Sequence, residues 1–597
     1  MRLMNMKNAT SKTQLLMALV VAVTLLLTPA AFAAAPGITS TTGTAGTFKL
    51  TAQDAYLNQP DGEAVYSWGY GCANGSAPSF QPAAIAGAFC NTMQVPGPTM
   101  IVTEGQTVTV SLTNNLPTAA GNTSILFPGF IVSVTCPVST TPGAPQQGIL
   151  TCEAVPGGSV TYTFTASAPG THAYYSGTQG DLQVEMGLYG AIIVLPKTIP
   201  ADCDSTSANG GYHYLNVQAQ AYWKENDFRL TNASGGKGAA YDHPGSCYDR
   251  EYLFQWAEMD SRIHREAQAQ VQARIGCTAG TMGCSLDVQT EPYHPAYFLI
   301  NGRSMPDLMD PNYASEYPHQ PYNGNPHMHP GELTLIRTVG QGRWQHPFHE
   351  HANHVRILAR DGNLILSNSA VPISYSTPGG AAVSATGLAG ILMFNTDTTP
   401  GEAFDGIFYF TGRGLNWDPY GHHPGPDTGT SPDGTGNPAT DPLAHLTCTP
   451  DANGYNTLGT SYTQVNFFEW CQDHNKPVEV NPFGDVASGG PATLPDPNVL
   501  TNGAWYGGTP YLGPDATLRA RMPTCTSIAG TGTPTPGTNC TTLQPANVQA
   551  NPANERGWAF MWHSHNEREI TTNNVFPGGM LMMMLVDSRE FVIDESL

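Results

Sequence analysis

Short segments that alternate apolar and polar residues restrict the fold of this chain more than any other feature. Residues 98–116 (PTMIVTEGQTVTVSLTNNL) and 159–166 (SVTYTFTA) follow a period of two, and 188–195 (LYGAIIVL) is a continuous apolar run. A period of two places alternate side chains on one buried face, as in a β-strand. The 64 Gly and 49 Pro residues favour short strands and many turns. The sequence therefore predicts an all-β fold.

The strand signals divide the chain into regions. Residues 40–200 predict one β-sandwich, with 98–116 as an antiparallel strand pair joined by a turn. Residues 201–411 and 554–597 predict a second region, which forms either one domain or two. Between them, residues 412–553 are rich in Gly, Pro, Asp, Asn and Thr and predict a long irregular insertion.

One segment has the composition of a helix instead of a strand. Residues 261–274 (SRIHREAQAQVQAR) are rich in Ala, Gln and Arg, which all favour helical backbone. We expect them to form a helix inserted in the second β region.

The N-terminus has the layout of a secretory signal peptide. Basic residues precede the apolar run 15–27, which is followed by Ala31-Phe32-Ala33, so residues 1–33 are predicted to be removed. The alternative is a membrane anchor, although the run is short for a span. We expect a secreted or periplasmic protein with no membrane span in the mature chain. The formal net charge of −22 argues against nucleic acid as a partner.

The 12 cysteines agree with export to an oxidising compartment. A thiolate metal site is the alternative, but no CxxC pattern occurs. Sequence alone does not fix connectivity, and near-neighbour spacing favours six disulfides: 72/90, 136/152, 203/247, 277/284, 448/471 and 525/540.

Two clusters of histidine point to metal binding. His349 and His351 are two residues apart, so on a strand both imidazoles face the same side, and His563 and His565 repeat that spacing. Two strands that each present such a pair form a nitrogen-ligand set suited to copper, zinc or iron. Buried or surface histidines without a ligand role are the alternative. A third pair, His327 and His329 around Met328, suggests a further copper-collecting site or, more simply, an exposed loop pair.

Several segments resemble the multicopper oxidase superfamily, which includes laccases and bilirubin oxidases. The clusters lie in sequences similar to its HPxHxH and HCH motifs, and framework segments match in the expected order. They are HPFHEHANHVRILARDG (346–362), WHSHNEREITTNNVFPGGM (562–580), VPGPTMIVTEGQTVTVSLTNNLP (95–117), PGGSVTYTF (156–164), GLYGAIIV (187–194) and FLINGRSMPD (298–307). The resemblance implies tandem cupredoxin domains, which are Greek-key β-sandwiches, here with long irregular insertions.

The resemblance also implies copper as the cofactor. In this family a type 1 copper accepts electrons and a trinuclear cluster reduces dioxygen. By the resemblance, His349, His351, His563 and His565 match trinuclear ligands, and His346 matches a type 1 ligand. Ser564 stands where the type 1 cysteine is expected and Glu569 where its second histidine is expected. We therefore keep Glu569 with His346 as a candidate nitrogen/oxygen metal site.

The first region departs further from the family. Its two expected histidine pairs are replaced by Leu126-Phe127-Pro128-Gly129 and Tyr175-Ser176-Gly177, so the sequence predicts a divergent member that lacks several copper ligands. We expect an exported copper-binding oxidoreductase that oxidises a phenol or a metal ion with O2 as acceptor. A non-catalytic copper-binding scaffold is the alternative. Substrate and oligomeric state are not encoded in these motifs.

Overall fold

The computed structural model describes most of the two predicted β regions. The described residues are 35–410, with gaps at 83–84, 86, 138–140, 201–202, 204–237, 329–331, 368–372, 377–381, 386–387 and 409, and also 508–512, 520–521, 523–528, 540–545, 556–587 and 592–593. The predicted signal peptide and most of the predicted insertion at 412–553 lie outside them. Among the residues that are described, none of the helices has the length and apolar character needed to cross a membrane.

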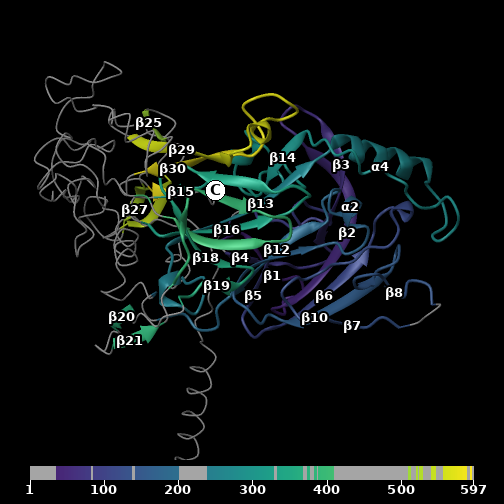
Figure 1. The fold of residues 1–597 in the computed structure, drawn as a ribbon, viewed down its shortest axis with the longest axis horizontal. Coiled ribbons are helices and arrows are strands. Elements are labelled where there is room, and N and C mark those ends of the chain that lie inside the picture. The colour runs from purple at the N-terminus through teal and green to yellow at the C-terminus, as the bar shows by residue number, and fades with distance from the viewer. Residues whose placement is uncertain are drawn as a thin grey trace, which may run out of the picture.

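Two five-stranded sheets make the first sandwich (Figure 1). Its core lies between the sheets and contains Trp68, Leu112, Tyr162 and Ile192, all fully buried or nearly so. One sheet has the order β11 (Gly170–Tyr175), β12 (Tyr189–Leu195), β5 (Met100–Thr103), β1 (Gly37–Ser40) and β4 (Ser79–Gln81). The other has the order β3 (Ala64–Cys72), β2 (Thr47–Asn58), β6 (Thr107–Asn114), β10 (Ser159–Thr165) and β7 (Ser133–Val134).

The predicted strand pair within 98–116 is wrong. β5 and β6 are both strands, but they belong to opposite sheets of the sandwich and pair with other strands. The turn between them passes through Gly105, whose φ of +82° suits a residue without Cβ. Alternation of apolar residues identifies a strand with one buried face, but it does not identify the strand's partner.

The second sandwich also consists of two sheets. The first has the order β14 (Tyr297–Ile300), β13 (Arg250–Met259), β16 (Thr334–Gly340), β24 (Ala403–Phe408), β18 (Val355–Arg360) and β19 (Asn363–Leu364), with β22 (Leu392–Met393) beside β18. The second has the order β15 (His327–Met328), β30 (Leu581–Asp587), β29 (Arg556–Ser564), β17 (His346–Glu350) and β23 (Asn395–Thr398). β25 (Gly508–Leu512), from the predicted insertion, pairs with β29.

Smaller elements complete the described fold. They are the two-stranded ladders β8 (Gln146–Gln147) with β9 (Cys152–Glu153), β20 (Ile373–Ser376) with β21 (Ala382–Ala385), β26 (Ala520–Arg521) with β31 (Val592–Ile593) and β27 (Pro523–Ile528) with β28 (Cys540–Pro545), the short helix α2 (Gly180–Gln183), and 3-10 turns at Thr118–Ala120, Pro244–Ser246, Asp307–Met309 and Glu567–Ile570.

The two sandwiches pack against each other through apolar sheet faces. Ala173 and Ile193 of the first sandwich share a buried cluster with Leu253 and Val339 of the second. Helix α4 (Ser261–Ala273) confirms the helix prediction and lies beside β3 (Figure 1). Its Asp260 caps the first turn by accepting from the backbone N–H of Arg262 (2.9 Å). The second β region is thereby fixed to the first.

Four of the six predicted disulfides are confirmed, at 72–90, 136–152, 203–247 and 277–284. Cys448, Cys471 and the side chains of Cys525 and Cys540 lie outside the described residues.

Candidate metal centre

The two histidine motifs lie on adjacent antiparallel strands. β17 and β29 pair so that His349 is directly opposite His563 and Phe348 is directly opposite Ser564. Directly opposite residues of an antiparallel pair place their side chains on the same face of the sheet. His349 and His563 therefore share one face, and Phe348, Ser564 and His346 share the other.

Three imidazoles converge on the first of these faces. One nitrogen from each of His349, His351 and His563 lies within 4.8 Å of the others, and all three residues are buried. The Nε2 atoms of His351 and His563 are 3.3 Å apart. The three rings contact edge to face, with centroids 4.8–5.4 Å apart. We call this group the three-histidine cluster.

The local environment keeps the imidazoles of His349 and His563 neutral. Burial, followed by the neighbouring imidazoles of His351, His563 and His565, lowers the pKa of His349 to about 3. Burial also lowers the pKa of His563, whose Nδ1 is 2.6 Å from the carbonyl of Ser564. A carbonyl can only accept, so Nδ1 carries the proton and Nε2 presents a lone pair to the cluster.

His565 lies at the edge of the cluster. Its ring centroid is 4.7 Å from that of His349, yet 45% of its side chain is exposed. Its Nδ1 is 3.6 Å from the carboxylate of Glu567, which is itself largely exposed. This position allows His565 to add a nitrogen at the open side of the cluster.

The donor chemistry of the cluster fits a transition metal. Neutral imidazole nitrogens are good ligands for copper, zinc, iron and nickel. Their packing within 4.8 Å gives a single ion access to all three residues after small side-chain adjustments. The residues present at this face therefore fit the metal that the sequence motifs predict.

The opposite face of the same strands carries a different arrangement. His346 donates from Nε2 to Glu258 (2.8 Å) and from Nδ1 to Glu569 (2.9 Å). Ser564 donates its Oγ–H to the same oxygen of Glu569 (2.5 Å). All four side chains are buried. We call Glu258, His346, Glu569 and Ser564 the carboxylate clamp.

The clamp holds a charged imidazole. Burial alone lowers the pKa of His346, but hydrogen bonds and charge attraction from Glu258 and Glu569 outweigh it and raise the pKa to about 9. Both ring nitrogens then donate to carboxylates. The metal-ligand role predicted for His346 and Glu569 stays a prediction, which the variants in the Discussion test.

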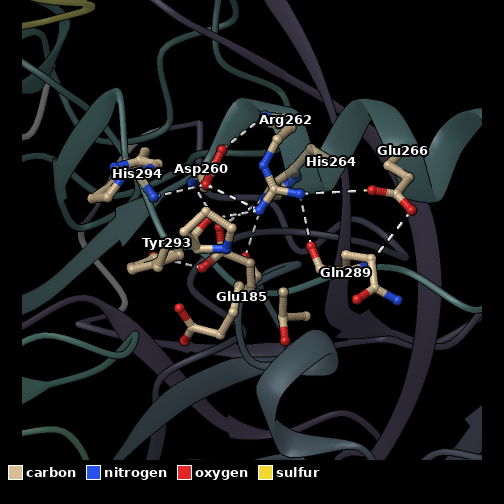
Figure 2. Close-up of polar contacts among 12 residues, drawn as sticks. Glu185, Asp260, Arg262, His264, Glu266, Gln289, Tyr293 and His294 are labelled. Atoms are coloured by element: carbon tan, nitrogen blue, oxygen red, sulfur yellow. Dashed lines mark hydrogen bonds and ion pairs between the residues drawn. The ribbon is translucent and has the colours of Figure 1, made fainter.

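The clamp continues into a buried polar network between the sandwiches. Glu258 also accepts from the backbone N–H groups of Arg343 (2.7 Å) and Trp344 (2.8 Å). The Tyr293 hydroxyl lies 2.6 Å from Glu185 and 3.1 Å from Glu258. Figure 2 shows Glu185 and Tyr293 within this network, next to Asp260, Arg262 and His264.

Sequence reasoning missed Glu258. It is 88 residues before His346, in the opposite sheet, and belongs to no local motif. A signal exists in retrospect, because β13 is buried at all ten positions and yet contains two glutamates, Glu251 and Glu258. Charged residues in a fully buried strand require partners.

The first sandwich contributes no imidazole at the four positions where the family resemblance expects them. These positions are Leu126, Pro128, Tyr175 and Gly177. His172, the nearest histidine in sequence, packs on Phe130 with ring centroids 4.6 Å apart, and its Nε2 is 3.1 Å from the carbonyl of Ala168. His327, predicted to lie in an exposed loop, is instead buried on β15, and His329 is outside the described residues.

Comparison with known proteins finds a similarity in the first sandwich. Residues 84–199 match the sequence model of the family described as multicopper oxidase. Two curated relatives match over a similar length. Multicopper oxidase MCE of Talaromyces pinophilus is 35% identical over 104 residues, and L-ascorbate oxidase of Brassica rapa subsp. pekinensis is 38% identical over 101 residues.

Residues 84–199 of this chain are therefore similar to the corresponding part of multicopper oxidases. The alignments cover 17% of this chain and 16% of each relative, so the match spans about a sixth of their length. Copper is the cofactor that this similarity implies.

Solved structures of copper proteins resemble parts of this chain. The blue copper oxidase of Nitrosomonas europaea is 18% identical with a TM-score of 0.34, covering 62% of this chain and 77% of that chain. The copper nitrite reductase of Nitrosomonas europaea is 19% identical with a TM-score of 0.33, covering 61% and 84%. At TM-scores this low, overall likeness identifies neither the activity nor the metal content of the chain.

Proposed function

We propose that this protein is an exported copper-binding oxidoreductase of the multicopper oxidase type that works with an incomplete set of copper sites. The observation that carries the proposal is the three-histidine cluster, in which buried neutral imidazoles from two paired strands converge within 4.8 Å. Export is supported by the predicted signal peptide and by the four disulfides. A secreted or periplasmic location follows from the same features.

His349, His351 and His563 would hold copper, with His565 able to complete the ligand set at the exposed side. When bound, copper supplies one-electron transfer between its +1 and +2 states. The chain's own residues would bind and orient the ion, and the neutral state of His349 leaves one ring nitrogen with a free lone pair at physiological pH. We propose a phenol or a metal ion as the external electron donor and O2 as the acceptor.

A second function, a non-catalytic copper-binding scaffold, is favoured by a specific observation. The positions equivalent to the family's type 1 site hold the carboxylate clamp, whose His346 engages both ring nitrogens with glutamates. The thiolate that carries electrons into the family's enzymes is replaced by Ser564. A copper site without this entry point can bind the metal without turning over a donor.

Metal analysis and oxygen uptake distinguish the two functions. The mature protein is loaded with Cu(II), its copper content is measured, and oxygen uptake is followed with a phenol or with ferrous ion. About one copper per chain and oxygen uptake, both lost in His563→Ala and kept in the exposed control His294→Ala, support the oxidoreductase. The same copper content without oxygen uptake supports the scaffold. Failure to bind copper contradicts both.

A further inference from the structure

A cavity of about 290 Å³ lies between the two sandwiches, away from the three-histidine cluster's strands. Residues of both sandwich regions form its walls. They include Leu126, Tyr175 and Val184 from the first region and Gln341, Gly342 and Gly401 from the second. Interfaces between domains are common places for small-molecule sites because two surfaces can close around a ligand.

The walls of the cavity include positions where the family resemblance expects histidines. Leu126, Tyr175 and Gly177 line it, and Pro128, the fourth such position, lines an adjoining cavity of about 460 Å³. The backbone N–H of Leu126 donates to the carbonyl of Tyr175 (2.7 Å), which fixes these walls side by side. A Cβ at Gly177 would approach the Leu126 side chain to 2.7 Å, so a larger residue there would displace Leu126.

The lining determines the charge of a ligand. Among the residues described as lining the two cavities, none has a charged side chain. A charged ligand would therefore lose hydration without gaining an opposite charge, which is costly. A neutral and mostly apolar molecule loses little hydration and gains contacts with leucine, valine and proline carbons.

One side chain offers a directed polar contact. Tyr175 is half-buried, and its hydroxyl would lie 3.5 Å from a Cβ built on Gly401, so it faces another residue of the cavity wall. Burial raises the pKa of Tyr175, and the hydroxyl therefore stays protonated and can donate or accept one hydrogen bond.

The volume determines the size of the ligand. An engineered cavity of about 150 Å³ holds benzene, so about 290 Å³ holds one substituted ring. Leu150 lies in the wall shared by both cavities and is 66% exposed, which places it at the mouth. A molecule can therefore enter without unfolding either sandwich.

We propose that this cavity binds a neutral, mostly apolar small molecule about the size of a substituted benzene ring, with one hydrogen-bonding group at the Tyr175 hydroxyl. The site is separate from the proposed copper site and does not depend on bound metal. Positions that hold metal ligands in the family would thus hold an organic ligand in this chain.

Calorimetric titration of the full chain, after treatment with a chelator, tests the site with three related probes. We expect 4-ethylphenol to bind with saturation and 4-ethylbenzoate, its charged analogue, to bind at least ~10-fold more weakly. Tyr175→Phe should lower the affinity for 4-ethylphenol by about threefold to tenfold, because one hydrogen bond is lost. It should leave the affinity for ethylbenzene unchanged.

Two tryptophan variants provide the matched pair. Leu150→Trp places a large side chain at the mouth of the cavity and should lower the affinity for 4-ethylphenol at least ~10-fold. Ile149→Trp adds the same bulk at the neighbouring residue, which is 97% exposed and does not line either cavity, and should bind like wild type. Both positions are exposed, so neither change disturbs a core. No saturable binding of 4-ethylphenol, equal binding of the benzoate, or equal effects of the two variants would overturn the proposal.

Discussion

His346 and His349 lie three residues apart on β17 and occupy opposite chemical environments. His349 faces other imidazoles, and its pKa falls to about 3. His346 faces Glu258 and Glu569, and its pKa rises to about 9. Burial lowers both values, so the neighbours decide the sign of the difference. One face of the strand pair thus presents neutral nitrogen donors, and the other holds a charged group between carboxylates.

The comparison also separates two ways of using buried histidine. Neutral imidazoles close together are a poor arrangement for stability, since each disfavours protonation of the next, but a good one for a metal. An imidazolium between two carboxylates satisfies its own charge and leaves no nitrogen lone pair. In this chain, residues 346–351 contain both kinds of histidine.

Loss of copper binding at the three-histidine cluster should be the largest effect. Zinc sites with four protein ligands reach about 10–16 kcal/mol, so each ligand carries on the order of 4 kcal/mol. His349→Ala and His563→Ala should each lower the Cu(II) affinity by about 1,000-fold. His565→Ala should cost less, because its side chain is 45% exposed. Chelator competition measures these affinities, and an unchanged affinity in His563→Ala contradicts the cluster as the metal site.

The next largest effect should be a loss of folding stability when the carboxylate clamp is changed. His346→Leu leaves Glu258 and Glu569 buried without their shared cation, which should cost about 3–5 kcal/mol in urea denaturation. The triple change with Glu258→Gln and Glu569→Gln should recover much of this loss, because no buried charge remains unpaired.

The same variant sharpens the comparison through its copper content. If His346 belongs only to the clamp, the Cu(II) affinity of folded His346→Leu should stay within about tenfold of the wild-type affinity. Removing a group that only supports a metal ligand reduces affinity by about tenfold at the low end. Abolished copper binding in a folded His346→Leu protein would instead make His346 a ligand, as the sequence motif predicts.

A smaller effect should appear in the pH dependence of stability of the metal-free protein. The ordinary histidine pKa is about 6.5. The raised pKa of His346 gives stability that is complete below about pH 6.5 and is lost as the pH rises through 9. The lowered pKa of His349 gives stability that is present above about pH 6.5 and is lost as the pH falls toward 3.

Denaturation midpoints measured across this pH range separate the two contributions. His346→Leu should flatten the alkaline limb, and His349→Ala should flatten part of the acid limb. Equal alkaline slopes in wild type and His346→Leu would show that the clamp does not hold a proton.

The smallest expected effect is a null result at Ser564. A thiolate there would need a histidine nitrogen and a second nitrogen ligand to form a blue copper centre. Both ring nitrogens of His346 donate hydrogen bonds to glutamates, and Glu569 stands where the second nitrogen ligand is expected. Ser564→Cys alone should therefore show no intense thiolate-to-copper absorption on copper loading. Appearance of that band would mean that copper displaces the clamp.

Local patterns in the sequence predicted the local structure well. The spacing of two predicted that each histidine pair shares a strand face, and His349 and His563 do lie opposite each other on β17 and β29, with His351 and His565 directly after those strands. Near-neighbour spacing predicted the four disulfides that the structure describes. Partners distant in sequence were not predictable. The separation of β5 from β6 and the contact of Glu258 with His346 depend on how sheets stack, which a period of two does not encode.

We infer that metal binds at the three-histidine cluster on one face of β17 and β29. The opposite face of these strands then keeps the carboxylate clamp. Paramagnetic resonance of the Cu(II)-loaded protein tests it most directly, with wild type, His563→Ala and His346→Leu compared. We expect a spectrum without blue-copper features and with nitrogen couplings from the three-histidine cluster, which His563→Ala should abolish and His346→Leu should preserve. A blue-copper spectrum, or one abolished by His346→Leu and preserved by His563→Ala, would contradict it.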